Sequence, residues 1–229
     1  MQNPFRAEEL RHRLAHNGDL SALKRTYTKN FAEIKDLNKK KFWNKRIVID
    51  RPGLKHNPIY QDKMDIISRH LRTQKGKILD IGFGWGVLEN KIADNKNIQV
   101  SGIDISTEAV RYAKANLKGK FKTSNIFDIP FEKNEFDIVV ALDILEHIKP
   151  SKIFSAYKEI HRVLKKGGTF FVSIPINEGL EEMVKKGSNP VSHLRIYTPD
   201  IIQAELKLSG FEIVKTEFRF AFRKLYKLK

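Results

Sequence analysis

The stretch KILDIGFGWGVLE, residues 77–89, joins a short apolar run, three glycines at alternate positions and the start of a helical pattern. Gly82, Gly84 and Gly86 would let the backbone turn sharply and let a ligand approach it closely. A helix that begins just after them offers N–H groups without intrahelical partners. The stretch therefore predicts a ligand-binding loop between a strand and a helix, with a tight turn that binds nothing as the other interpretation.

The spacing of these glycines excludes two common phosphate-binding loops. A dinucleotide site of the form Gly-x-Gly-x-x-Gly needs its third glycine at position 87, which is Val87. The phosphate loop of nucleotide triphosphatases ends in Gly-Lys-Ser/Thr, and that triplet does not follow. Instead Asp80 precedes the glycines, and a carboxylate attracts an ammonium group but repels a phosphate.

A second acid follows at the end of the next apolar run. Asp104 stands where an acidic residue takes the ribose hydroxyls in nucleotide-binding folds. Together, Asp80 and Asp104 predict a ligand that carries a ribose and a cationic amine but no phosphate. S-adenosylmethionine has this chemistry.

Beyond residue 76, short apolar runs alternate with amphipathic helical stretches. We expect strands at 77–80, 98–103, 136–142 and 169–174, and helices at 87–94, 107–117 and 152–164. Repeated strand–helix–strand units imply a mostly parallel sheet that is covered on both faces. Residues 211–226 alternate apolar and basic side chains, which predicts a late antiparallel strand.

The first 58 residues differ from the rest and read as a basic helical extension. Helical periodicity is visible over 5–16 and 21–37, and turn signals stand at 51–53. We therefore divide the chain into an extension, 1–58, and a main domain, 59–229.

The formal net charge of +16 is concentrated at the two ends of the chain. Residues 1–60 carry a net charge of +8 and residues 215–229 a net charge of +5, counted from the sequence. A basic surface attracts polyanions such as RNA or anionic lipid, although solvated lysines without a partner explain the same count.

The amino-acid composition excludes several classes of protein and of functional site. The 229 residues include no cysteine, so disulfides, thiolate metal sites and cysteine nucleophiles are excluded. No run approaches the roughly 20 apolar residues of a membrane helix, and the N-terminus lacks the apolar core of a signal peptide. We expect a cytoplasmic protein, with peripheral membrane contact through the basic ends as an alternative.

Taken together, the motifs resemble those of class I S-adenosylmethionine-dependent methyltransferases, in the style of the ubiquinone-biosynthesis O-methyltransferases. The likeness rests on the glycine loop with Asp104, and on residues 124–131, 136–148, 161–168 and 193–211, which resemble later family motifs in the same order. It covers about 59–218. It implies a Rossmann-like, doubly wound α/β fold, with a mostly parallel seven-stranded sheet whose last strand is antiparallel.

The resemblance also implies the cofactor and its contacts. S-adenosylmethionine would be the methyl donor and S-adenosylhomocysteine the product. Asn125 would meet the adenine amino group, and the backbone of Ile126 a ring nitrogen. The cofactor-binding residues that we predict are Asp80, Gly82, Gly84, Gly86, Asp104, Ile105, Asn125, Ile126, Ala141 and Leu142.

Two histidines are candidates for the general base. His147 follows the strand predicted at 136–142, and His193 lies in a polar loop. Neutral imidazole is suited to take a proton near pH 7. A divalent cation on Asp143, Glu146 and His147 is an alternative, but we expect no metal.

Three classes of function fit the sequence. We favour transfer of a methyl group to a hydroxyl of a small molecule. The alternative is an RNA methyltransferase that docks through its basic ends, although the Asn/Asp-Pro-Pro-Tyr/Phe motif of amino-methylating enzymes does not follow the strand predicted at 136–142. A cofactor-binding protein without catalysis is the third class. The sequence gives neither the acceptor nor the oligomeric state.

Overall fold

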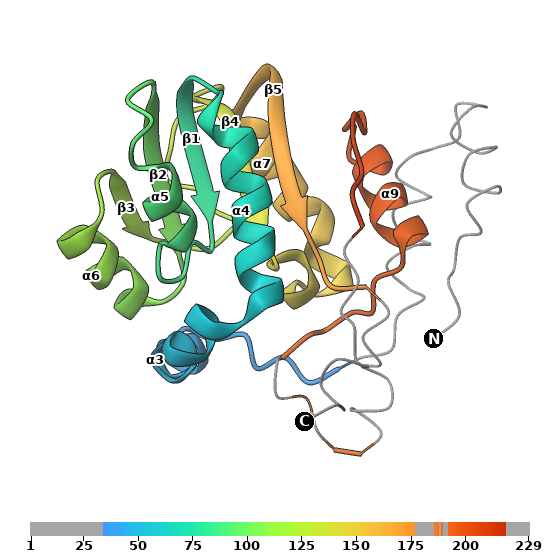
Figure 1. The fold of residues 1–229 in the computed structure, drawn as a ribbon. Helices are drawn as coiled ribbons and strands as arrows, with labels where there is room; N and C mark the ends of the chain where they lie inside the picture. The colour runs from blue at the N-terminus through green and yellow to red at the C-terminus, as the bar shows by residue number, and fades with distance from the viewer. Residues whose placement is uncertain (1–33, 177–185, 188, 190–191, 219–229) are drawn as a thin grey trace, which may run out of the picture.

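A computed structural model describes residues 34–176, 186–187, 189 and 192–218 of the chain (Figure 1). Its centre is a sheet of five parallel strands in the order β3-β2-β1-β4-β5. The strands are β1 (Gly76–Ile81), β2 (Ile98–Asp104), β3 (Lys120–Thr123), β4 (Phe136–Leu142) and β5 (Leu164–Ser173).

Helices connect and cover these strands. They are α3 (Lys40–His56), α4 (Pro58–Arg72), α5 (Val87–Ile92), α6 (Thr107–Asn116), α7 (Ile153–Val163) and α9 (Pro199–Leu208), with short 3-10 turns η1 (Leu145–His147) and η2 (Pro150–Lys152). Several starts are capped by a side chain. Asn57 accepts from two N–H groups of α4, Ser106 from one of α6 and Thr198 from one of α9.

The central strands β1 and β4 are buried on both faces, as their apolar side chains require. Leu79 and Val139 belong to the cluster that includes the apolar side of α7. Their neighbours Ile78 and Val140 point the other way, into the cluster formed with α4 and α5. The alternate side chains of β1 and β4 thus pack against two layers of helices, and Figure 1 shows α4 and α7 on opposite faces of the sheet.

The strand count differs from the expectation of seven strands with an antiparallel last strand. The described residues form five strands, and all of their pairings are parallel. Residues 211–218 have no regular secondary structure. Phe211 stacks on His161 of α7 with ring centroids 3.9 Å apart, while Val214 is 91% exposed. The ring of Phe211 holds the described part of the segment, and a ladder of backbone hydrogen bonds to a neighbouring strand does not. The rest of the predicted strand lies outside the described residues.

The predicted turn at 51–53 is also wrong, because α3 runs through it to His56. Proline and glycine disfavour a helix interior, but α3 is held upstream by contacts of Asn44 and Ile47 with the main domain. The helix expected at 5–16 and most of the helix expected at 21–37 lie outside the described part of the chain, and residues 34–37 of the second are not helical. The division near residue 58 therefore stays a prediction.

The position of α3 indicates where a ligand site can lie. Figure 1 shows α3 beyond the carboxyl ends of the central strands, whose arrowheads point toward it. Ligands of open parallel sheets bind at this edge. Among the residues that the structure describes, no helix combines the length and hydropathy that crossing a bilayer requires.

Candidate functional site

The glycine loop leaves β1 and bends against the end of β2. The N–H of Gly82 donates to the carbonyl of Ile103 at 2.7 Å, and that of Gly84 to Asp104 Oδ2 at 3.1 Å. Gly84 has φ 58°, a conformation that favours glycine. A Cβ there would meet nothing closer than Ile47 Cδ1 at 4.0 Å, so the loop faces open space that a larger side chain would fill.

Asp104 stands at the end of β2 with its carboxylate already oriented. Oδ1 accepts from the N–H of Ser106 at 2.7 Å, and Oδ2 from Gly84. Each carboxylate oxygen offers about two acceptor positions, so one on each oxygen remains for the two hydroxyls of a ribose. Burial raises the pKa of Asp104 to about 6, against the lowering by its two N–H donors.

A second pair of acids lies at the end of β1. Asp80 is 5% exposed and Glu89, on the first turn of α5, is 4% exposed. Burial, followed by the charge of Glu89, raises the pKa of Asp80 well above its usual range. Burial also raises the pKa of Glu89 to about 7. Sequence reasoning missed Glu89, although an acid between the core residues Leu88 and Ile92 was a visible signal.

The other predicted cofactor residues lie at the same edge of the sheet. Ile105 follows β2, Asn125 and Ile126 follow β3, and Ala141 and Leu142 end β4. Asn125 is exposed, and its Oδ1 accepts from the N–H of Phe127 at 2.8 Å, whereas Ile126 is 7% exposed. Open space at the loop, buried carboxylates and four strand ends fit the cofactor that the sequence predicts. Their roles stay predictions.

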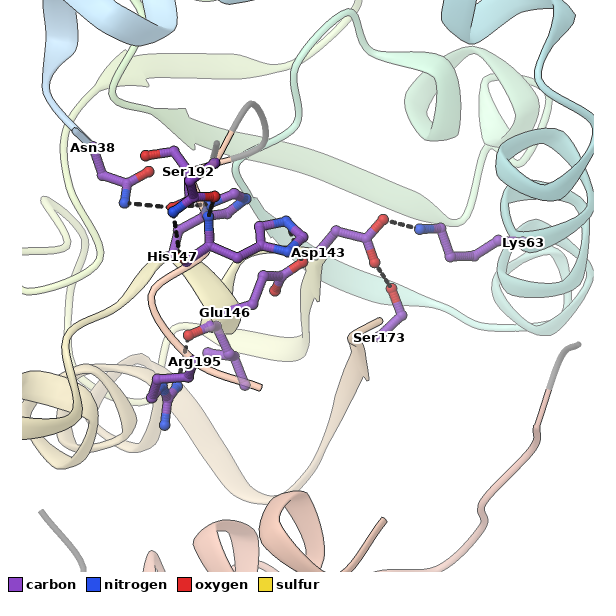
Figure 2. A network of polar contacts seen from close by, with 11 residues as sticks. Asn38, Lys63, Asp143, Glu146, His147, Ser173, Ser192 and Arg195 are labelled. Carbon is purple, nitrogen blue, oxygen red and sulfur yellow. Dashed lines mark hydrogen bonds and ion pairs between the residues drawn. The ribbon is translucent and has the colours of Figure 1, made fainter. Parts of the chain in front are cut away.

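The two candidate bases, 46 positions apart in the sequence, meet in the fold. The rings of His147 and His193 lie 4.8 Å apart, edge to face. His147 Nδ1 is 3.3 Å from the carbonyl oxygen of Ser192, a contact drawn in Figure 2. Because a carbonyl only accepts, this bond places the proton on Nδ1 and leaves the lone pair on Nε2. Burial, followed by the charge of His193, lowers the pKa of His147 to about 4.

Glu146 joins the two histidines. His193 Nε2 is 3.9 Å from Glu146 Oε1, and the possible ligand atoms of Glu146, His147 and His193 all lie within 4.8 Å of one another. Three such groups could hold a metal ion. This trio is not the one weighed from the sequence, because Asp143 turns elsewhere.

Asp143 pairs with Lys63 of α4 and accepts from Ser173 Oγ at 2.9 Å, so that it bridges α4 and the end of β5 (Figure 2). Its φ of 56° is unusual for a residue other than glycine. Backbone strain of this kind persists where surrounding contacts impose it, and it is frequent at functional sites.

A buried network holds the loop of His193 in place. Arg195 and Glu205 of α9 form an ion pair with no exposed side-chain surface, and Arg195 also donates to the Leu145 carbonyl at 2.6 Å. Tyr157 and Tyr197 donate to the same glutamate at 3.1 and 2.8 Å. The network joins α9, the 192–197 segment and η1, and so brings His193 against His147.

Helix α3 closes the remaining side of the site. The ring of Trp43 lies 4.8 Å from that of His147. Asn44 Oδ1 accepts from the N–H of Thr107 at 2.9 Å, at the start of α6. Trp85 Nε1 in the glycine loop donates to the Ile47 carbonyl at 2.7 Å. The sequence did not single out Asn44, since an asparagine in a basic stretch carries no motif.

Comparisons with known proteins agree with this architecture. Residues 78–168 match the family model described as "Methyltransferase domain". Cyclopropane-fatty-acyl-phospholipid synthase of Escherichia coli (strain K12) is 31% identical over 113 residues, which cover 49% of this chain and 30% of that protein. Ubiquinone biosynthesis O-methyltransferase of Nitrosospira multiformis is 30% identical over 123 residues, covering 51% and 49%. The chain thus spans half or less of these two relatives.

A solved structure supports the fold. A SAM-dependent methyltransferase from Archaeoglobus fulgidus has a TM-score of 0.58 at 19% identity, and the match covers 72% of this chain and 77% of that chain. At this identity the likeness shows the fold alone. The fold is Rossmann-like, with a parallel sheet.

Proposed function

We propose that this chain, whose residues 78–168 belong to the class I S-adenosylmethionine-dependent methyltransferases, transfers a methyl group to a hydroxyl of a small-molecule acceptor. The observation that carries the choice of a hydroxyl is the hydrogen bond of His147, whose Nδ1 donates to the Ser192 carbonyl and so leaves the lone pair on Nε2. Burial lowers its pKa to about 4, which keeps the ring uncharged near neutral pH and also makes it a weaker base than free imidazole. A hydroxyl must lose its proton as it attacks, and a neutral imidazole can take it.

Each residue of the site has its own role in the proposed reaction. When bound, the cofactor supplies an electrophilic methyl group on a positively charged sulfur. Asp104 would hold the ribose, Asp80 the ammonium group, and the open face of Gly84 the body of the ligand. His147 Nε2 would take the acceptor proton as the acceptor oxygen bonds to the methyl carbon, and the bonding pair stays on the departing sulfur. Holding donor and acceptor in line supplies most of the rate enhancement.

His193 supports this chemistry in our proposal. Its ring packs edge to face on His147, and its Nε2 lies 3.9 Å from Glu146. It is the second candidate for the base if the acceptor enters from its side. We propose that neither histidine acts through a metal ion.

The acceptor class follows from the site and from the relatives together. The name of the Escherichia coli relative refers to a fatty-acyl phospholipid, and that of the Nitrosospira relative to ubiquinone. Trp43 and His147 line one side of the site with rings. An apolar acceptor that carries a hydroxyl fits this surface, and a cytoplasmic location with access to membrane-derived molecules fits such an acceptor.

A paired-acceptor assay tests the proposal. Purified protein would be given methyl-tritiated S-adenosylmethionine with a phenol, and in parallel with the methyl ether of that phenol, for a panel of phenols and quinols. We expect label only in compounds with a free hydroxyl. Label in an amine or an alkene analogue, or in added RNA and in no hydroxyl compound, would contradict O-methylation of a small molecule.

A further inference from the structure

We infer that Glu89 is a second carboxylate for the cationic amine of the cofactor, and that with Asp80 it forms a paired seat for the α-ammonium group of S-adenosylmethionine. The inference rests on the proposed function and deepens it. It concerns a residue beyond the Asp80–Gly86 motif on which the family resemblance depends, and it assigns that residue a ligand.

The burial of Glu89 lowers the stability of the ligand-free protein. It is 4% exposed, and neither carboxylate oxygen receives a hydrogen bond of good geometry from another side chain of the described residues. Its polar neighbours are its own backbone N–H and Asp80, which is itself an acid. A buried carboxylate without a cation beside it is strongly unfavourable. An apolar residue at this point of α5 would pack beside Leu88 and Ile92 without that cost. The carboxylate therefore points to a partner that arrives from outside the chain.

The groups around the pair include acids and a phenol but leave it without a cation of its own. Asp104 ends the neighbouring strand, and its charge adds to the raised pKa of both Asp80 and Glu89. Tyr60 of α4 faces the same acids, since burial and then the charges of Asp80, Glu89 and Asp143 raise its pKa. Tyr60 therefore stays a neutral donor.

The nearby cation is already engaged. Lys63 of α4 pairs with Asp143 and lies 5.6 Å from the centre of the Tyr60 ring. Within the described part of the chain, neither Asp80 nor Glu89 forms an ion pair with a lysine, arginine or histidine. Buried acids that lack a cation suit a ligand that brings a positive charge, because that charge favours their ionised forms.

An α-ammonium group matches this seat in its number of hydrogen-bond donors as well as in the sign of its charge. It has three N–H donors, and two carboxylates offer acceptors on two sides of it. Charge-assisted hydrogen bonds of this kind are about twice as strong as neutral ones. The adenosine part of the cofactor has no such group, so only the amino-acid end would depend on Glu89.

A comparison of two ligands separates a role of Glu89 in binding the ammonium group from a general loss of protein structure. Calorimetric titrations would compare S-adenosylhomocysteine, which carries the ammonium group, with methylthioadenosine, which lacks the amino-acid end. We expect Glu89→Gln to weaken S-adenosylhomocysteine binding by about tenfold or more and to leave the methylthioadenosine affinity within about twofold. The control variant Glu132→Gln changes an exposed glutamate away from the site and should leave both affinities as in the wild type.

Thermal unfolding of the ligand-free protein gives an independent readout. If Glu89 is retained for a ligand, Glu89→Gln removes an uncompensated charge and raises the unfolding midpoint at pH 8 by about 2 °C or more. The gain should shrink toward pH 5, where the wild-type carboxyl is protonated. A lower midpoint at pH 8 would make Glu89 a structural residue and overturn the inference.

The remaining outcomes are also decisive. Unchanged S-adenosylhomocysteine binding by Glu89→Gln, or an equal loss for both ligands, overturns the seat while the proposed function stands. Wild-type protein that binds neither ligand overturns the proposed function, and the seat falls with it.

Discussion

At the scale of single residues, burial acts in opposite directions on the two kinds of titratable group at this site. It lowers the pKa of His147 to about 4 and raises that of Asp104 to about 6. Near neutral pH the histidine is therefore an uncharged base, while the carboxylate is still ionised and able to accept. The roles that we propose for them, a base and an acceptor for the ligand's hydroxyl groups, are therefore compatible at the same pH.

The first prediction concerns His147. Replacement by alanine should lower turnover by about 10²–10⁴-fold, because the acceptor proton loses its base, and should leave S-adenosylhomocysteine affinity unchanged. Steady-state kinetics and calorimetry measure the two effects, and the exposed His56 provides a control substitution. Full turnover in both His147→Ala and His193→Ala would assign catalysis to proximity alone.

The low pKa of His147 also predicts a pH dependence of stability. The native state holds this imidazole neutral down to about pH 4, whereas the unfolded chain protonates it near its usual 6.5. Between these values the unfolded state binds more protons, so the contribution of His147 to the free energy of unfolding falls as the pH falls, by roughly 3 kcal/mol in all. His147→Gln should flatten denaturant-derived stability between pH 7 and 4. An equally steep profile in the variant would contradict the assignment.

The third prediction concerns Asp104. Asp104→Ala should weaken S-adenosylhomocysteine binding at least about tenfold, since it removes two charge-assisted hydrogen bonds of roughly 1.5–3 kcal/mol each. It also releases the Gly84 N–H, which Asp104 fixes at 3.1 Å. Calorimetry measures the loss, and a wild-type affinity would reject the ribose assignment.

At the scale of elements, the loop of His193 depends on a buried ion pair. Arg195→Met would leave Glu205 charged and unpaired in a fully buried position, and breaking such a pair costs about 3–5 kcal/mol. The exposed Lys215–Glu217 pair is the matched control, with Lys215→Met changing stability by less than about 1 kcal/mol. Chemical denaturation measures both variants, and equal effects would mean that Arg195 holds nothing in place.

The central elements were predictable because their patterns are local. The strand over 136–142 was predicted to the residue, and β1 within one residue at either end. The helix expected at 107–117 is α6, Thr107–Asn116, and Ser106 caps its start. Apolar periodicity and capping depend on neighbouring residues only, and both survive in the fold.

The failures concern contacts that are distant in sequence. The alternation over 211–226 is local, but a strand also needs an edge to pair with, and Phe211 packs on α7 instead. The partners of Asn44 lie more than 60 residues away, at Ser106 and Thr107. The approach of His193 to His147 was likewise outside the reach of spacing, because it depends on Arg195 and on α9. The sequence offered each histidine as a separate candidate for the base but did not predict that the two would meet.

At the scale of the whole molecule, the basic excess and the site meet at α3. The basic excess lies in residues 1–60 and 215–229, most of which the structure does not describe, and the candidate site lies at the strand ends of the main domain. From the basic N-terminal part, Trp43 and Asn44 of α3 contact the site, so the proposed reaction uses this helix and does not require the rest of the two ends.

Binding experiments at this scale test whether the ends act as a docking surface. We expect neither RNA nor anionic vesicles to bind more tightly than about 100 µM at about 0.1 M salt, the weak limit of non-specific association. Filter binding and vesicle sedimentation measure these affinities. Tighter RNA binding whose log affinity falls with log salt by about 0.7 per phosphate contact would favour the RNA alternative.

The central claim is that the chain moves a methyl group from S-adenosylmethionine to a hydroxyl of a small molecule. The most direct measurement supplies methyl-tritiated S-adenosylmethionine and cell extract, and then counts label in the small-molecule, lipid and RNA fractions alongside the S-adenosylhomocysteine formed. The account predicts that label enters small molecules, and that blocking the hydroxyl groups of those molecules beforehand abolishes the labelling. It also predicts one S-adenosylhomocysteine for each methyl group transferred. Label confined to RNA, or no S-adenosylhomocysteine above a heat-treated control, would contradict it.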